Sequence, residues 1–422
     1  MATREDIELA VDTFSMAVAP WWKDALDGGR RRGSSSREDA MTDLYHDLCS
    51  AVALQDERAV LRVRATYQPA GGEGARIFPP TYPVERGSSS PYVLEERYVQ
   101  GAVRKDVLLD SVPSQANRAE EALLRARREG RIELPLLEIH HEGAASVRLV
   151  SLQLPHRYAD AYLMDSEIDG VPFDKTDLGR AFQAASADDA SVLLRHDPGS
   201  LVFGAWNSHR KGRQAKFPRI YSSEVIGWDP QLGERRAGRM DPLNLTGLGS
   251  RSGDGELSYV SVGEKAKGKR LSEIGHGNIA PNPAPGGVTV SSAERMATVS
   301  LAGLGRIGFG ELPAPAGVAA RAFLAAYALV ADRLAFGSPS LWLRSGCELV
   351  TVAETVEWVL RGGGTQPIDL TVAAALGLYE RAVAAVSDAG LVPEMQAVTL
   401  IPRKGLKAAI DFALTKSDGT GE

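Results

Sequence analysis

The order of strand-like and helix-like segments constrains the fold of this chain most. An apolar–basic alternation over 59–67 predicts a strand, and a short buried strand at 107–109 precedes a helix over 116–128. Paired strands follow, and two long helices are expected at about 317–335 and 371–388. Because strands and helices are intermixed without a regular βαβαβ alternation, we predict an α+β fold rather than a doubly wound parallel sheet.

Composition excludes several classes of protein. Of 422 residues, 44% are hydrophobic and 24% are charged, which is typical of a globular protein and excludes wholesale disorder. The formal net charge of −6 excludes a globally basic nucleic-acid binder but permits a locally basic one. Cys49 and Cys347 are too few for a Cys-rich zinc site or a disulfide framework, and we expect a cytoplasmic protein.

No segment is expected to enter a membrane. The first residues carry acids where a signal peptide needs a basic start and an apolar core. The most apolar stretch, 318–336, is interrupted by Arg321, Asp332 and Arg333. A membrane helix needs about 20 uninterrupted apolar residues, so this stretch is predicted to be a buried helix.

The glycine-rich sequence GLGRIG, residues 303–308, matches a dinucleotide-binding pattern only superficially. Pro313 and Pro315 delay the next helix, and no acid lies near position 325. These glycines are therefore expected to serve a turn or a close approach of backbone.

Two further groups of reactive residues give only weak indications of a metal site or a catalytic triad. His140, His141 and Glu142 are adjacent on a predicted strand, so their side chains point to alternate faces and lack metal-ligand spacing. A triad of Ser111, His156 and Asp110 is conceivable, but no GxSxG elbow supports it. We predict no catalytic residue, no metal and no cofactor.

The stretch 200–223 is more informative because it is basic and has no acid between Pro198 and Ser223. A strand-like apolar segment, 201–206, precedes a basic loop, and the rings of Phe217 and Tyr221 offer faces on which bases could stack. Cations combined with aromatic rings suit a phosphate backbone and unstacked bases, although a solvated basic loop is an equal alternative. The candidate residues are Asn207, Ser208, His209, Arg210, Lys211, Arg213, Lys216 and Arg219.

Two smaller groups add to these candidates. The first lies in a glycine-containing loop, 263–270, and in the glycine-containing segment that follows it. A solvated surface loop is the simpler interpretation of 263–270. The group comprises Lys265, Lys267, Lys269, Arg270, His276 and Asn278. The second opens the helix after the buried strand, where free N–H groups favour anions and where Ser114 is the expected N-cap; it comprises Ser114, Gln115, Asn117 and Arg118.

Four segments in a fixed order carry a family resemblance. They are DSVPSQANRAEEAL (110–123), SLQLPHRYADA (151–161), LVFGAWNS with KFPRIYSSEVIGW (201–228), and LSEIGHGNIAP with GGVT (271–289). Together they resemble the backbone subunit of the type I-G (formerly I-U) CRISPR surveillance complex, Cascade, in the RAMP superfamily. The resemblance spans about 76–301 and continues more loosely to the C-terminus, where GLGRIGFG looks like a loose version of the RAMP glycine-rich loop.

The resemblance implies a distorted RRM/ferredoxin-like body, called the palm, with a β-hairpin thumb and large insertions. Copies of the subunit would polymerise along the CRISPR RNA and present its spacer to target DNA. Other partners implied are the large subunit, guide-end-binding subunits and a helicase–nuclease that performs the cleavage. His156 and Arg157 join the RNA-contact candidates above, whereas Asp110, Glu120 and Glu224 are expected to serve folding or subunit contacts.

The resemblance also divides the chain. An N-terminal helical segment is expected over 1–58, a first palm part over 59–228 with an insertion at 69–106, a thumb or loop insertion over 229–290, and the palm's completion with C-terminal helices over 291–422. The stretch 79–92 is a second thumb candidate. Two other functions stay open: a RAMP-type endoribonuclease that would use Asp110, His156 or His209, and a scaffold that binds protein only.

Overall fold

The computed structural model describes residues 37–54, 56–84, 90–143, 146–206, 216–252, 255–260 and 268–417. The chain forms two compact units, Met1–Leu44 and Tyr45–Glu422. Helix α3 (Arg37–Val52) crosses the boundary between them. Every other described element belongs to the second unit.

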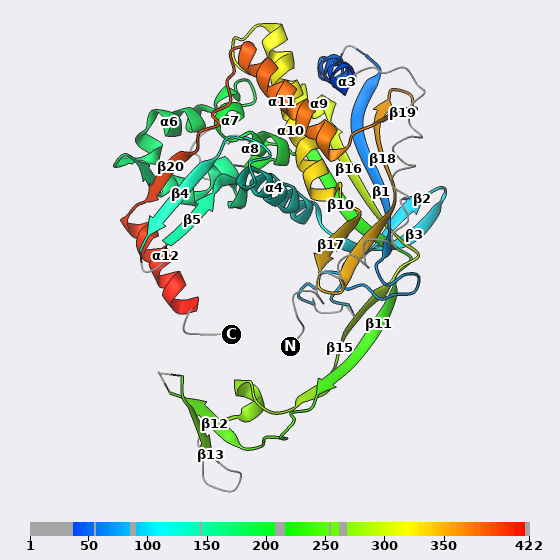
Figure 1. Ribbon diagram of the computed structural model, residues 1–422, viewed down its shortest axis with the longest axis vertical. Helices are drawn as coiled ribbons and strands as arrows, with labels where there is room; N and C mark the ends of the chain where they lie inside the picture. The colour runs from blue at the N-terminus through cyan, green and yellow to red at the C-terminus, as the bar shows by residue number, and fades with distance from the viewer. Residues whose placement is uncertain are drawn as a thin grey trace, which may run out of the picture. The chain divides into compact units, whose positions relative to one another are not determined.

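An antiparallel sheet of eight strands organises the second unit (Figure 1). Its order is β17-β18-β1-β16-β10-β3-β2, and β19 pairs with β18. The bounds are β1 Arg58–Pro69, β2 Leu94–Val99, β3 Ala102–Asp110, β10 Tyr221–Trp228, β16 Ser292–Ser300, β17 Ser340–Arg344, β18 Cys347–Leu360 and β19 Thr365–Ile368.

The centre of this sheet has a ferredoxin-like order. Along the chain the elements run β1, α4 (Val112–Arg128), β10, β16, α10 (Ala314–Phe336) and β18, which is a βαββαβ sequence. Side by side the strands run β18-β1-β16-β10, so the fourth strand lies next to the first and the third separates the first from the second. All these pairs are antiparallel. The predicted α+β class is confirmed.

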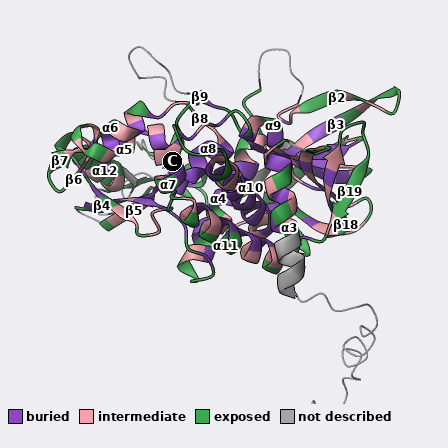
Figure 2. Ribbon diagram, turned by 90° about the horizontal axis from the view of Figure 1, so that it is seen from above, coloured by how far each residue is buried: buried purple, intermediate pink, exposed green. Residues whose placement is uncertain are grey.

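The alternation in β1 decides which face of the sheet is covered. Leu61, Val63 and Tyr67 are buried, whereas Arg62 is half-buried and Arg64 is exposed. The two arginines thus share the opposite face, as the period of two predicts. Helices α4 and α10 pack against each other, and α10 is buried for most of its length (Figure 2).

Helix α10 confirms the buried helix predicted from its sequence. Its length and apolar composition would also suit a membrane span, but 72% of its most apolar window is buried inside the protein. Helix α11 (Val372–Asp388) packs alongside it.

Two of the three charges that interrupt α10, Asp332 and Arg333, form a buried network with the sheet. Asp332 accepts hydrogen bonds from Arg295 of β16, from Tyr221 of β10 at 2.8 Å, and from its neighbour Arg333. Arg333 also pairs with Glu354 of β18. Each charge in this network therefore has an opposite partner, which offsets the cost of removing it from water.

A smaller five-stranded sheet, β5-β4-β20-β6-β7, lies beside the helices (Figure 1). Strand β20 pairs parallel with β4 and antiparallel with β6. The bounds are β4 Leu137–Glu142, β5 Ser146–Val150, β6 Ser166–Ile168, β7 Val171–Pro172 and β20 Val398–Pro402, and the nearby helices are η1 Ser151–Gln153, η2 Arg157–Ala159, α5 Ala161–Met164, η3 Phe173–Lys175, α6 Asp177–Ala184, α7 Ser191–His196, α8 Pro198–Phe203 and α12 Lys404–Ser417.

A long hairpin continues the sheet strands β10 and β16. Strand β11 (Gln231–Arg239) follows β10 and pairs antiparallel with β15 (Ile279–Thr289), which leads into β16. Between them lie β12 (Leu248–Arg251), β13 (Leu257–Val260), β14 (Lys269–Arg270) and the turn η4 (Leu271–Ile274). We call residues 229–290 the arm (Figure 1).

Two local predictions were wrong. Helix α4 begins at Val112 and its N-cap is Ser111, not Ser114; Pro113 lies in the first turn, where its missing N–H costs nothing. Most of the apolar stretch 201–206 is not a strand, because Pro198 starts the short helix α8, which continues to Phe203 and leaves only Ala205–Trp206 extended. Gly204 ends this helix with φ +83°.

Gly308 of the GLGRIG motif allows two backbone segments to approach closely, as predicted. The short helix α9 (Leu301–Leu304) ends early in the motif, and α10 begins only at Ala314. The Gly308 N–H donates to the Ala187 carbonyl at 2.7 Å, and a Cβ on Gly308 would clash with the Asp188 carbonyl. The motif therefore packs against the turn before α7.

The paired histidines are also structural. His140 lies 3.0 Å from Glu138, whereas His141 is buried and lies 2.8 Å from Asp411 of α12. Within the described ranges, no group of three or more His, Cys, Asp or Glu residues could hold a metal ion.

Candidate functional site

The first motif is built around Asp110, at the end of β3. Its carboxylate accepts hydrogen bonds from Ser114 Oγ at 2.7 Å, Gln115 Nε2 at 2.5 Å and Arg118 Nε at 2.8 Å. Asp110 is 1% exposed. These contacts fix the start of α4 against β3, which agrees with the expectation that Asp110 serves folding.

Gln115 is buried and extends the same network into the sheet. Its Oε1 accepts from Ser223 Oγ at 2.8 Å and from Arg295 Nε at 3.1 Å. Arg118 in turn donates to the Leu343 carbonyl at 2.7 Å. Gln115 and Arg118, which we predicted to contact RNA, thus donate hydrogen bonds to other groups of the protein. Asn117 of the same group is exposed.

The second motif is joined to the first by an ion pair. Arg157 donates to both carboxylate oxygens of Glu120 on α4, at 2.6 and 3.0 Å, and to the Gly204 carbonyl at 2.7 Å. Burial raises the pKa of Glu120 to about 7, against the lowering effect of Arg157. Arg157 adopts φ +51°, an uncommon conformation for a residue with a side chain, and these three hydrogen bonds hold it. Its neighbour His156 is exposed.

The third motif presents an aromatic ring and a cation at the surface. Strand β8 (Ala205–Trp206) pairs with β9 (Lys216–Phe217), so that Trp206 lies opposite Lys216. Trp206 is 54% exposed, and the Lys216 Nζ lies 4.4 Å from its ring centroid. Arg219, three residues after Lys216, is also exposed. We call Trp206, Lys216 and Arg219 the basic platform.

The aromatic residues predicted for stacking are the wrong ones. Phe217 is 4% and Tyr221 is 2% exposed. Phe217 packs edge-on against Tyr158, and Tyr221 packs against Phe203. Both rings therefore fill the core beneath the platform, and Trp206 has the exposed position in their place.

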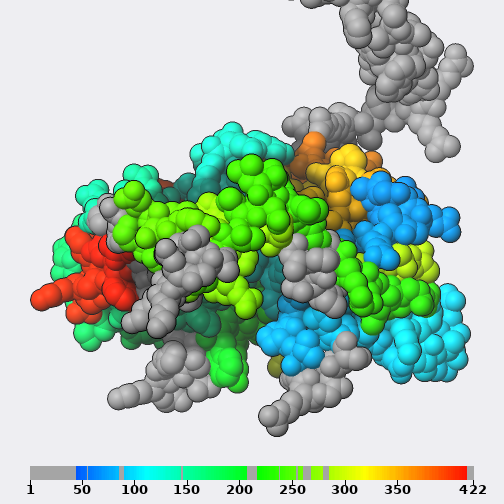
Figure 3. Space-filling model, turned by 90° about the horizontal axis from the view of Figure 1, so that it is seen from below, coloured from blue at the N-terminus to red at the C-terminus, as the bar shows by residue number. Residues whose placement is uncertain are grey.

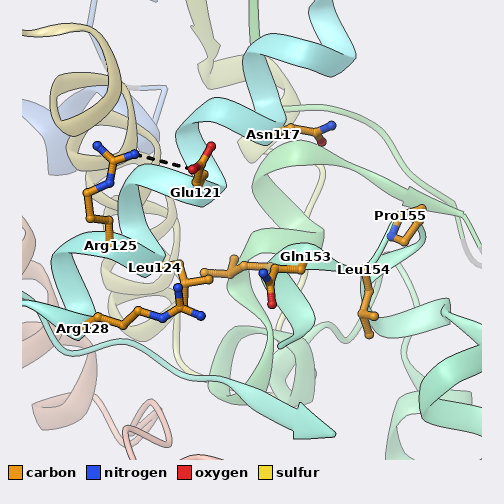
Figure 4. A pocket seen from close by; sticks show the side chains of 9 residues that line it. Asn117, Glu121, Leu124, Arg125, Arg128, Gln153, Leu154 and Pro155 are labelled. Atoms are coloured by element: carbon orange, nitrogen blue, oxygen red, sulfur yellow. Dashed lines mark ion pairs between the residues drawn. The ribbon is translucent and has the colours of Figure 1, made fainter. Parts of the chain in front are cut away.

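A pocket of about 450 Å³ lies between α4 and η1 (Figure 4). Leu124, Leu152 and Leu154 give it an apolar part. Its polar lining includes Asn117, Glu121, Arg125, Arg128 and Gln153, with Glu121 and Arg125 paired at 3.5 Å. Arg125 and Arg128 are exposed cations that sequence reasoning did not single out, because they look like ordinary helix-surface residues.

The arm carries another set of exposed basic side chains. Lys269 and Arg270, which we predicted as RNA contacts, lie on β14 and are exposed. The sequence analysis did not single out Arg235, Arg236 and Arg239, which are exposed on β11. The signal for these three was the run GERRAGR, whose exposure only the hairpin reveals. Figure 3 shows the arm, in green, across the face seen from below.

His276 and Asn278 stabilise the far end of the arm. The His276 N–H donates to the Leu271 carbonyl at 2.8 Å. Asn278 accepts from the Asp241 N–H and donates to Asn244, both at 2.6 Å. The remaining candidates lie outside the described residues; they are Asn207, Ser208, His209, Arg210, Lys211, Arg213, Lys265 and Lys267.

Comparisons with known proteins give one family match. The model of a family described as CRISPR-associated protein GSU0053 matches residues 61–231, less than half of the chain. That region includes β1, α4 and the basic platform, so this part of the chain resembles a CRISPR-associated protein. No curated protein matches the chain.

Among solved structures, the chain is similar to the crystal structure of Csc2 from Thermofilum pendens. The identity is 12%, the TM-score is 0.24, and the match covers 88% of this chain and 80% of that one. A TM-score this low supports no inference about fold or function.

Proposed function

We propose that this protein is the RNA-binding backbone subunit of a type I CRISPR surveillance complex, of the I-G subtype. The observation that carries the proposal is the match of residues 61–231 to a CRISPR-associated family. The ferredoxin-like strand order that the same residues help to build supports it. Copies of the subunit assemble along one CRISPR RNA in the cytoplasm and hold its spacer for pairing with target DNA. The large subunit, guide-end-binding subunits and a helicase–nuclease are the other partners.

The arm is the element we propose as the thumb. It extends directly from the β10–β16 pair and carries exposed arginines, whereas the described part of 79–92 forms no strand of its own. The division of the chain at 59–228, 229–290 and 291–422 follows from this assignment.

The RNA contacts proposed are those whose side chains reach solvent. Among the described residues they comprise Asn117, His156, Lys216, Arg219, Lys269 and Arg270. The candidates in 207–215 and 265–267 lie outside the described residues and are proposed from their sequence alone. Cations on one surface suffice for sequence-independent binding of phosphates, even at a net charge of −6. Gln115, Arg118 and Arg157 position these elements from inside.

Catalysis is not part of the proposal. The endoribonuclease alternative rests on Asp110, His156 or His209, and Asp110 is buried and accepts from four donors, which leaves it unavailable as an acid or base. We propose that the subunit binds nucleic acid and that the recruited helicase–nuclease cuts it.

The test is to purify the chain after co-expression with a CRISPR array and the array's other subunits. The 260/280 nm absorbance ratio, sequencing of the bound RNA and the particle mass are measured together. We expect a large particle with several copies of this chain on one guide-length RNA. A nucleic-acid-free monomer would reject the proposal and favour the protein-only scaffold.

A further inference from the structure

Trp206 is a large apolar side chain that lies mostly at the surface. Of the other described tryptophans, Trp228 and Trp358 are buried, at 5% and 1% exposed, whereas Trp342 is 60% exposed. Trp206 lies on a two-residue strand with 54% of its surface exposed, and the Lys216 ammonium lies 4.4 Å from its ring centroid. An indole held in water beside a cation is the pairing that binds a nucleotide by its base and its phosphate.

The backbone under Trp206 is held rigidly. The Gly204 carbonyl is bound by Arg157, and a Cβ at Gly204 would press on the Arg219 side chain. On the partner strand, Phe217 is buried against Tyr158. Stacking on a fixed ring loses little conformational entropy, so this anchoring favours binding.

We propose that Trp206 is a stacking platform for one unpaired nucleobase of the bound RNA, and that Lys216 neutralises a phosphate of the same strand. This inference rests on the proposed function and adds a base contact to it. Every nucleobase has a π-face that can stack on an indole, whatever hydrogen-bonding groups its edge carries. The platform therefore stacks on any base, as a guide with variable sequence requires.

The test compares two ligands that differ only in their bases. Fluorescence anisotropy measures the affinity of the full chain for a labelled oligouridine and for an abasic oligonucleotide of the same length and charge. Trp206→Ala should weaken oligouridine binding roughly tenfold, within the range for loss of one stacked base, and leave abasic binding unchanged. Trp206→Phe should retain most of the affinity because it keeps a ring.

Trp342 supplies the matched control. It lies on the edge strand β17 with 60% of its surface exposed, so Trp342→Ala removes an equally exposed indole elsewhere. This variant should bind both ligands as the wild-type chain does. Circular dichroism and thermal unfolding confirm that each variant is folded.

The outcomes separate the two proposals. If the wild-type chain binds oligouridine and Trp206→Ala loses nothing, or loses the same factor on both ligands, the stacking role is wrong while RNA binding stands. If the wild-type chain binds neither oligonucleotide, the proposed function and this inference fall together.

Discussion

Arg157 holds Glu120 through two hydrogen bonds, Nε to Oε1 at 2.6 Å and Nη2 to Oε2 at 3.0 Å, and uses its third donor on the Gly204 carbonyl at 2.7 Å. One guanidinium therefore links α4, η2 and the chain that leads into Trp206. Three of the four motifs noticed in the sequence meet at this residue.

Arg157→Lys should destabilise the protein although it keeps the charge. A lysine cannot make the two-point contact with Glu120 and also reach Gly204, so we expect a loss of about 2–3 kcal/mol in the free energy of unfolding. Urea titration monitored by circular dichroism measures it. The exposed Arg128→Lys on α4 serves as control and should change stability by less than about 0.5 kcal/mol. Equal stability of both variants would contradict the positioning role.

Sequence reasoning worked where the information is local. The period of two in β1 placed Arg62 and Arg64 on one face, and the three charges in 318–336 marked a buried helix. Neither conclusion depends on residues distant in the chain.

The polar residues of the motifs were harder to interpret from sequence. Gln115 looked like a ligand contact because an amide serves RNA and a buried network equally well. Its true partners, Ser223 and Arg295, lie 108 and 180 residues away along the chain. Trp206 was missed for a similar reason, because its exposure depends on how α8 ends and how β9 returns.

Asp332→Asn should remove much of the acid sensitivity of folding. Burial opposes ionisation of Asp332, but Arg295 and Arg333 outweigh it and lower its pKa from 3.8 to about 2. A depressed folded-state pKa gives stability that is present above the unfolded value and lost as pH falls through the folded one, here between about pH 4 and 2. The variant should lose this slope and, at pH 7, about 3–5 kcal/mol, since Arg295 stays charged and buried.

Urea titrations from pH 2 to 7 measure both effects. The exposed Asp388→Asn at the end of α11 is the control and should retain the wild-type slope. A slope unchanged in Asp332→Asn would mean that the ion pair with Arg295 does not form in solution.

The two cysteines should react at different rates. Cys347 is 0% exposed, and burial raises the pKa of its thiol to about 11. Cys49 is half-buried, and burial also raises the pKa of its thiol. Because the thiolate is the reactive form, iodoacetamide at pH 8 should label Cys49 slowly and Cys347 only after unfolding in urea. Peptide mapping by mass spectrometry distinguishes them, and rapid native labelling of Cys347 would contradict its place in the sheet core.

Reversing the charges of the basic platform should change how RNA affinity depends on salt. The slope of log affinity against log salt is near −0.7 for each phosphate neutralised on a single strand. Lys216→Glu with Arg219→Glu should therefore make the slope shallower by about 1.4 and weaken binding at low salt. Lys404→Glu with Lys407→Glu, at the exposed start of α12, makes the same change in net charge elsewhere. If both double variants shift the slope equally, the effect comes from net charge alone and the RNA does not lie along the platform.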